Sequence, residues 1–61
     1  MTIMTVPKDP VMLLSWVNTQ LRDRYETLDA LCEDAGLERA SLEDTLTGID
    51  YRYSEEQNQF I

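Results

Sequence analysis

The sequence has no histidine and only one cysteine, Cys32, among its 61 residues. One cysteine cannot form a disulfide within the chain, and zinc sites built from histidine and cysteine are excluded. A chain of this size buries only about 60% of the surface that its unfolded form exposes, so a core without disulfide or metal is marginally stable. We therefore expect a single small domain over residues 1–61, stabilised by efficient packing or by association with a second copy.

Basic residues are also scarce. Five lysines and arginines stand against twelve aspartates and glutamates, which gives a formal net charge of −7. An acidic surface disfavours binding to nucleic acid and to anionic membranes, although it suits a basic partner. No apolar run approaches the roughly 20 residues of a membrane span, and MTIMTVPKDP lacks the features of a signal peptide. We expect a cytoplasmic protein with no membrane partner, because a lone cysteine suits reducing surroundings.

Residues that support catalysis are few. Histidine, the usual general base, is absent, and the carboxylates of EDTLT and SEE are of a kind common on surfaces. The sequence has neither the spaced carboxylates of a calcium loop nor a glycine-rich phosphate loop. Cys32 is followed by Glu33 and Asp34, which disfavour a thiolate, so we expect a buried, unreactive cysteine. We predict no enzyme activity, and no catalytic residue, metal site, cofactor or small-molecule substrate.

The first of three predicted helices begins after Asp9. Its carboxylate can cap the helix, and Pro10 occupies the first helical position, where its missing N–H costs nothing. The apolar stripe predicted to face the core comprises Pro10, Leu14, Val17, Leu21 and Tyr25, with Leu13 at its edge. Met12 and Trp16 fall on nearly the opposite side. A helix that is apolar almost all round must be covered on two sides.

Two shorter helices are predicted before residue 48. Thr27 is expected to cap LDALCEDA, which Gly36 would end in a left-handed conformation. Ser41, with Asp44 three residues later, resembles a capping box for LEDTLT, which Gly48 would end. The residues spaced to meet the first helix in one core are Leu28, Leu31, Cys32, Ala35, Leu37, Leu42, Leu46 and Ile49.

Both ends of the chain are expected to lie outside these helices. Residues 1–8 predict an N-terminal tail or an edge strand. The segment IDYRY, residues 49–53, alternates apolar and polar residues at the strand period, and QFI could return as a second strand after SEEQN. In the rival interpretation Ser54 caps a last helical turn, since Gln57 stands three residues on. We favour a hairpin over residues 49–61, which gives a mainly α, three-helix domain with a short C-terminal β-hairpin.

The second and third predicted helices form a helix-turn-helix-like corner. Cys32 supplies the small residue where the helices cross, and Gly36 supplies the turn. The apolar residues that would lock the second helix of this corner are Leu37, Leu42 and Leu46. Residues 28–46 nevertheless contain six acidic residues and a single basic one, Arg39. Affinity for DNA depends on lysine and arginine that neutralise phosphates, so a nucleic-acid partner is not expected for the single chain.

The predicted partner surface lies on the first helix. Met12 and Trp16 suit an interface core, where methionine and aromatics are enriched, although the hairpin or the N-terminal segment could cover them. Asn18 and Arg22 could grip a partner's backbone or carboxylate, or could hydrogen-bond the chain's own loop or C-terminal segment. The expected partner is another protein or, most simply, a second copy in a symmetric homodimer.

Two functions are compatible with these residues. The leading hypothesis is a non-catalytic, acidic protein-interaction module. The alternative is a helix-turn-helix-type DNA-associated transcriptional regulator that acts as a dimer or with a basic partner.

Three segments carry a resemblance to a known family: KDPVMLLSWVNTQLRD, LDALCEDAGL and IDYRYSEEQNQF. They resemble short bacterial proteins of about this length that are catalogued as a domain of unknown function. The likeness covers nearly the whole chain. It implies a small cytoplasmic bacterial protein, and it carries no activity and no functional residue that could be transferred.

Overall fold

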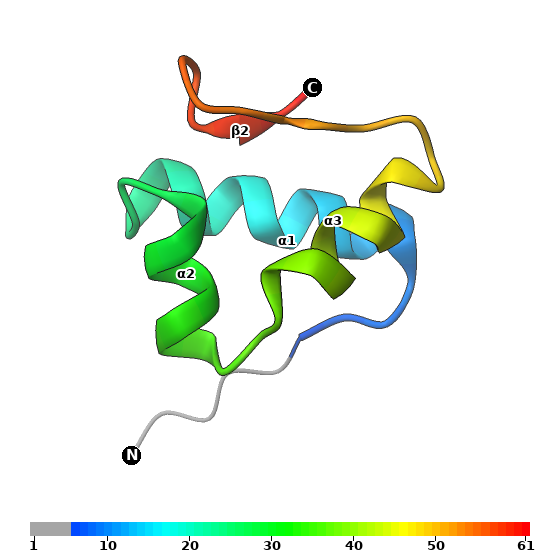
Figure 1. The fold of residues 1–61 in the computed structure, drawn as a ribbon, viewed down its shortest axis with the longest axis horizontal. Helices are drawn as coiled ribbons and strands as arrows, with labels where there is room; N and C mark the ends of the chain where they lie inside the picture. The colour runs from blue at the N-terminus through cyan, green and yellow to red at the C-terminus, as the bar shows by residue number, and fades with distance from the viewer. Residues whose placement is uncertain (1–5) are drawn as a thin grey trace.

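The computed structural model describes residues 6–61 and contains three helices followed by a two-stranded antiparallel hairpin (Figure 1). The elements are α1 (Pro10–Asp23), α2 (Leu28–Ala35), α3 (Arg39–Thr47), β1 (Tyr53–Ser54) and β2 (Gln59–Phe60). The predicted fold class is therefore confirmed, and the rival helical turn after Ser54 is wrong. Of the predicted N-terminal tail or edge strand, residues 1–5 lie outside the described residues, and residues 6–8 belong to neither helix nor strand.

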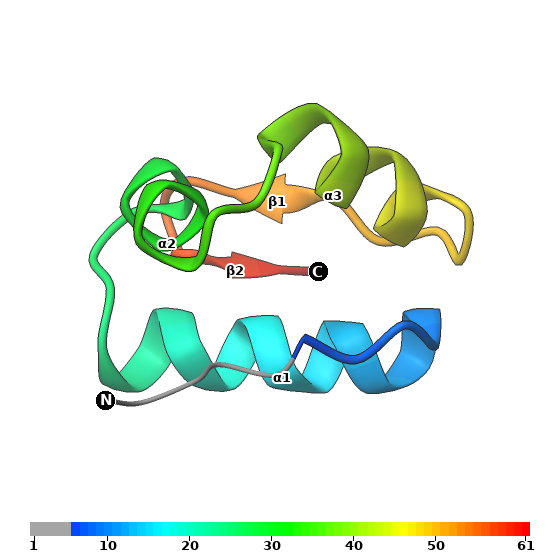
Figure 2. The same ribbon diagram turned by 90° about the horizontal axis from the view of Figure 1, so that it is seen from below.

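The start of α1 follows the prediction. The Asp9 carboxylate accepts a hydrogen bond of 3.1 Å from the Met12 amide, and Pro10 is the first helical residue. The buried face differs from the predicted stripe: its buried residues are Leu13, Val17 and Leu21, whereas Leu14 and Tyr25 are only half-buried. The stripe is turned toward Leu13 because α2, α3 and β2 all contact this helix from one side, as Figure 2 shows.

The limits of α2 also agree with the sequence. The Thr27 hydroxyl accepts a hydrogen bond of 3.1 Å from the Ala30 amide, which satisfies one of the free amides of the first turn. Gly36 ends the helix with a φ of 71°, and its amide donates to the Cys32 carbonyl. This left-handed conformation is strained for any residue with a side chain, although a Cβ at Gly36 would meet no atom within 4 Å.

The predicted start of α3 at Ser41 is wrong. The helix begins at Arg39, and Glu38 occupies the capping position without a side-chain hydrogen bond. Ser41 lies inside the helix, where its carbonyl accepts a hydrogen bond from the Thr45 hydroxyl. The earlier start is favoured by Arg39, whose guanidinium binds Glu43 one turn later, at 2.5 Å between Nε and Oε1. A capping box has no comparable partner here because Asp44 is shorter than the usual glutamate.

The predicted strand at residues 49–53 begins too early. The amides of Asp50 and Tyr51 bind the carbonyls of Thr47 and Leu46 at 2.9 and 3.0 Å, so this segment closes α3 instead of extending. Asp50 adopts a left-handed φ of 67°, which aspartate tolerates better than most residues. Gly48 is the C-terminal cap of α3, as predicted, and has a right-handed φ of −60°, so the left-handed residue of this segment is Asp50.

Nine apolar residues form the buried core beneath the hairpin. They are Leu13, Val17, Leu21, Leu28, Leu31, Cys32, Leu42, Leu46 and Phe60. Phe60 is the aromatic member and is 2% exposed. It comes from β2, which lies between α1 and β1 (Figure 2). The hairpin therefore completes the core that the three helices form.

Shortening the side chain of Phe60 tests this role. Replacing a buried phenylalanine with alanine costs about 3–5 kcal/mol, which is as much as the core of such a small chain supplies. We expect Phe60→Ala to lose most of its helical circular dichroism at 25 °C. Ile61→Ala, at a neighbouring residue that is 52% exposed, should melt close to the wild type. A Phe60→Ala variant with wild-type helicity and melting temperature would contradict this account of the core.

Candidate functional site

The outward side of α1 carries the most exposed apolar side chains of the described chain. Met12 is 62% exposed and Val11 is 64% exposed. Trp16, the other apolar residue predicted at a partner surface, is half-buried and packs against the core. The helix has no charged residue from Pro10 to Gln20. We call Val11, Met12 and the accessible part of Trp16 the α1 surface.

Asn18 binds the chain's own C-terminal segment, which was one of the two alternatives predicted for it. Its Nδ2 donates to the Phe60 carbonyl at 3.2 Å, and its Oδ1 accepts from the Phe60 amide at 2.8 Å. The side-chain amide thus pairs with the edge of β2 as the backbone of a neighbouring strand would. Because both ends of this amide group bind Phe60, Asn18 holds the hairpin on α1.

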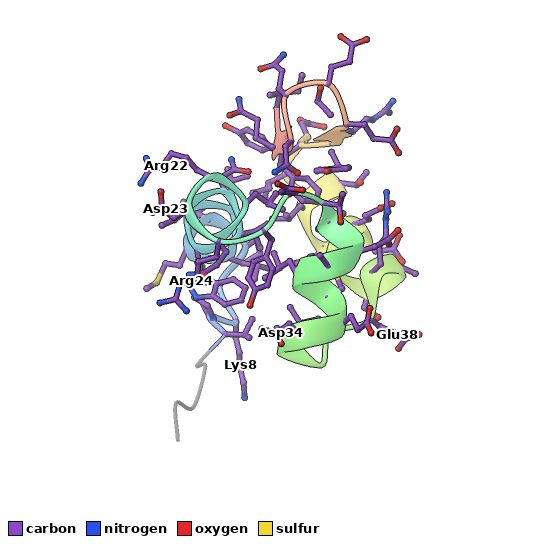
Figure 3. The ribbon with its side chains drawn as sticks, turned by 90° about the vertical axis from the view of Figure 1, so that its left-hand side faces the viewer. Lys8, Arg22, Asp23, Arg24, Asp34 and Glu38 are labelled. Atoms are coloured by element: carbon purple, nitrogen blue, oxygen red, sulfur yellow. The ribbon has the colours of Figure 1, made fainter. Side chains whose placement is uncertain are left out.

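Arg22 pairs with its neighbour in the chain. Its Nε lies 3.0 Å from Oδ1 of Asp23, and the two side chains are 74% and 53% exposed. The hydrogen bond from Arg22 lowers the pKa of Asp23. Such exposed pairs contribute little to stability, so Arg22 can exchange Asp23 for another carboxylate at small cost. In Figure 3 both side chains project from the side of α1 that is turned away from α2.

Asn58 joins the hairpin turn to two helices, a role that the sequence analysis missed. Its Nδ2 donates to the carbonyls of Leu21, in the last turn of α1, and of Tyr25, just after the helix, at 3.1 and 2.9 Å. Its Oδ1 accepts from the Tyr53 hydroxyl at 2.6 Å, and that hydroxyl accepts from the Leu28 amide at the start of α2. Asn58 has a positive φ of 52°, which asparagine adopts readily, so an asparagine ending a polar turn was the available signal.

The helix-turn-helix-like corner presents carboxylates at its surface. Asp34 and Glu38 are both exposed near the turn, and in Figure 3 they lie on opposite sides of α2. The Tyr25 hydroxyl donates to Asp34, and this hydrogen bond raises the pKa of the tyrosine. Arg39, the basic residue of the corner, binds two carboxylates. The corner therefore offers phosphate no free cation.

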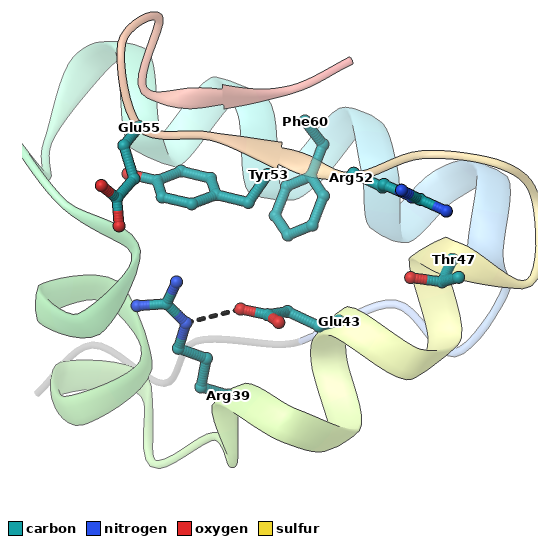
Figure 4. A pocket seen from close by; sticks show the side chains of 7 residues that line it. All are labelled: Arg39, Glu43, Thr47, Arg52, Tyr53, Glu55 and Phe60. Carbon is teal, nitrogen blue, oxygen red and sulfur yellow. Dashed lines mark hydrogen bonds and ion pairs between the residues drawn. The ribbon is translucent and has the colours of Figure 1, made fainter.

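Arg39 stands at the centre of a groove between α3 and the hairpin (Figure 4). Its Nη1 lies 2.9 Å from Oδ1 of Asp29, its Nε binds Glu43, and the hydrogen bonds that it donates to these carboxylates raise its pKa. The guanidinium carbon lies 5.4 Å from the ring centroid of Tyr53, within range of a cation–π contact. The Tyr53 ring in turn lies 5.6 Å from the ring of Phe60. This part of the groove has a volume of about 480 Å³.

Chemistry beyond binding has little support in these residues. Within residues 6–61, no three cysteine, aspartate or glutamate side chains are grouped to hold a metal ion. Cys32 is buried in the core, and desolvation raises the pKa of its thiol. The carboxylate of Glu43 in the groove is bound to Arg39. What the surface offers is apolar contact on α1 and a polar groove beside β1.

A comparison with known protein families assigns this chain to one of them. It belongs to the family described as Domain of unknown function (DUF4250), whose model matches residues 7–60. The predicted family resemblance is thereby confirmed. Comparisons with curated proteins and with solved structures gave no match. In the described part of the chain, every helix is too short or too polar to cross a membrane.

The state of Cys32 generates a prediction about its reactivity. A thiol that is buried and has a raised pKa reacts only when the chain opens. If the core supplies about 3 kcal/mol, alkylation by iodoacetamide should be on the order of 100-fold slower in buffer than in denaturant at the same pH. Mass spectrometry of timed samples measures both rates. Equal rates would mean that Cys32 is accessible and that the core is not closed around it.

Proposed function

We propose that this protein is a non-catalytic protein-interaction module that binds its partner through the α1 surface. The observation that carries the proposal is the exposure of Val11 and Met12 on a helix face without charge, in a chain of net charge −7. Ten of the twelve acidic residues lie from Glu26 onward, outside α1. An uncharged apolar face in an otherwise acidic protein is typical of a contact surface.

The composition of the α1 surface supports a protein partner. The cores of interfaces are depleted in charged residues and enriched in methionine and aromatic residues. Met12 and Trp16 are of these enriched types. Burying such side chains stabilises a complex by roughly 25 cal/mol per Å² of apolar area. Arg22 lies at the C-terminal end of the same helix with its side chain exposed, so it is available to a carboxylate at the rim.

A second copy of the chain is the simplest partner. A two-fold pair brings the same patch of each copy together, which is the commonest arrangement in oligomers. Pairing would also add stability to a core that lacks a disulfide. Repulsion between two acidic chains is limited because the carboxylates lie mainly outside α1 and because salt screens charges beyond about 8 Å. We propose the cytoplasm as its location, since one buried thiol suits reducing surroundings.

The alternative is a DNA-associated regulator. Its support is the helix-turn-helix-like shape of the corner formed by α2 and α3. Its chemistry opposes this role, because Arg39 is bound to Asp29 and Glu43 and the corner has no other basic residue. Such a regulator would need a basic partner or a second chain to approach phosphates. The pure protein at low salt separates the two functions: salt-sensitive retention on a DNA resin would favour the regulator.

Replacing Met12 with glutamate tests the α1 surface. The side chain is 62% exposed, so the fold should tolerate Met12→Glu, while a buried charge would weaken the contact at least ~10-fold. Sedimentation equilibrium of wild type and Met12→Glu measures self-association. Ile61→Glu is the matched control, since Ile61 is a similarly exposed apolar residue outside α1.

A wild type that stays monomeric at millimolar concentration would exclude the homodimer. The module itself is then tested by capture from a native lysate on immobilised wild type, Met12→Glu and Ile61→Glu, with mass spectrometry of the bound proteins. The proposal requires at least one protein that Ile61→Glu keeps and Met12→Glu loses. Identical sets of bound proteins on all three variants would overturn the proposed function.

A further inference from the structure

The two edges of the hairpin are unequal. On β2, the Phe60 amide and carbonyl are both bound by the side chain of Asn18. The edge nearest α1 is therefore already paired, and no further strand can be added there. The other edge belongs to β1, which Figure 2 shows on the side of β2 away from α1.

The register of the hairpin fixes where the backbone groups of β1 point. Arg52 and Ile61 exchange both of their backbone hydrogen bonds, at 3.0 and 2.8 Å. In an antiparallel pair such residues alternate with pairs that exchange none, and Tyr53 opposite Phe60 is the next pair. The Tyr53 amide and carbonyl therefore point away from β2. None of the residues from 6 to 61 supplies either group with a hydrogen-bond partner.

A groove runs beside this free edge, on both sides of the stacked Arg39 and Tyr53 side chains. One hollow, of about 480 Å³, reaches Thr47 and Arg52 (Figure 4). The second, of about 270 Å³, reaches Glu26 and Thr27 at the start of α2. Arg39, Tyr53 and Glu55 line both hollows. Residues 52–55 of an extended chain span roughly 10 Å, at about 3.3 Å per residue, so the groove suits a short extended segment.

The charges in the groove specify what that segment should carry. The second hollow holds the carboxylates of Glu26, Asp29 and Glu55. Arg39 offsets them only in part, because it is shared between Asp29 and Glu43. Glu26 and Glu55 form no ion pair within the described residues. The two hollows together are lined by four carboxylates and by two arginines, Arg39 and Arg52, so the groove beside Tyr53 is acidic and attracts lysine or arginine.

We propose that β1 binds an extended peptide segment with basic side chains, which pairs with the Tyr53 amide and carbonyl and places its lysine or arginine near Glu55. This is strand addition, in which backbone hydrogen bonds give affinity and alternate side chains give specificity. The site lies on a different element from the α1 surface, so it extends the proposed function to a second contact. The positive charge of the bound peptide also suits the acidic surface of the rest of the chain.

The test is a titration of the full ¹⁵N-labelled chain, followed by amide chemical shifts. The probe is the blocked peptide acetyl-Thr-Lys-Val-Lys-Thr-amide, whose two lysines share one face of a strand. We expect the Tyr53 amide to shift downfield in a saturable way as it gains a hydrogen bond. Two control peptides should bind at least ~10-fold more weakly: one with glutamate at both lysine positions, and one with a methyl group on the backbone nitrogen of both lysines.

Charge variants locate the contact. Glu55 is exposed and forms no side-chain hydrogen bond among the described residues, so Glu55→Lys should fold as the wild type does. It should weaken the peptide about 5–10-fold, as reversal of a charge at an interface rim does. Glu33→Lys is the matched control, because Glu33 is an exposed glutamate on α2 that does not line the groove. We expect no change in peptide affinity for it.

Three results would overturn the proposal. The first is a Tyr53 amide that does not shift up to millimolar peptide. The second is equal binding of the lysine and glutamate peptides, or equal loss in Glu55→Lys and Glu33→Lys. The third is a Tyr53 amide that shifts with protein concentration alone, because β1 would then pair with a second copy. Each leaves the α1 surface untouched, since that surface is tested by Met12→Glu.

Discussion

The fold depends on how two asparagine side chains hold the hairpin against the helices. A two-stranded hairpin alone is marginal in water, and this one has strands of only two residues. The side-chain amide of Asn18 gives the edge of β2 the hydrogen-bond partners that the backbone of a third strand would give. Asn58 ties the turn to the carbonyls that end α1. With the hairpin held there, Phe60 is buried and the core is closed without a disulfide or a metal.

The same arrangement decides which surfaces remain free. The hairpin covers one flank of α1, so Met12 stays exposed on the far side, while Val11 stays exposed beside the hairpin, where it borders a hollow with Tyr51 and Gln59. Because Asn18 occupies the edge of β2, the free backbone groups of the hairpin lie on β1. The two proposed contacts are therefore on separate elements and differ in chemistry: one is apolar and uncharged, and the other is polar and acidic. Neither needs the helix-turn-helix-like corner, whose arginine is bound to two carboxylates.

Local signals in the sequence predicted most of the helical part. Asp9, Thr27 and Gly36 act on atoms within four residues, so their roles follow from spacing alone. The errors arose where distant residues decide. The start of α3 depends on Arg39, which also reaches Asp29 ten residues earlier, and the strand was shortened by carbonyls at the end of α3. The contact between Asn18 and Phe60 spans 42 residues. From the sequence, Asn18 could bind either a partner or the chain's own C-terminal segment, and only the second of these roles describes the contact. The groove beside β1 could not be predicted from the sequence, because it depends on how the hairpin is placed relative to α3.

We expect the hairpin and the helices to unfold as one unit, because Asn18 binds both backbone groups of Phe60. Native-state hydrogen exchange of the Phe60 amide tests it most directly, with the amide of Leu21 in the middle of the core as reference. Both amides should exchange with the same free energy of opening, since local openings that release the hairpin would expose Phe60 and break the core. Exchange of the Phe60 amide orders of magnitude faster than that of Leu21 would show that the hairpin opens alone, and would contradict the account.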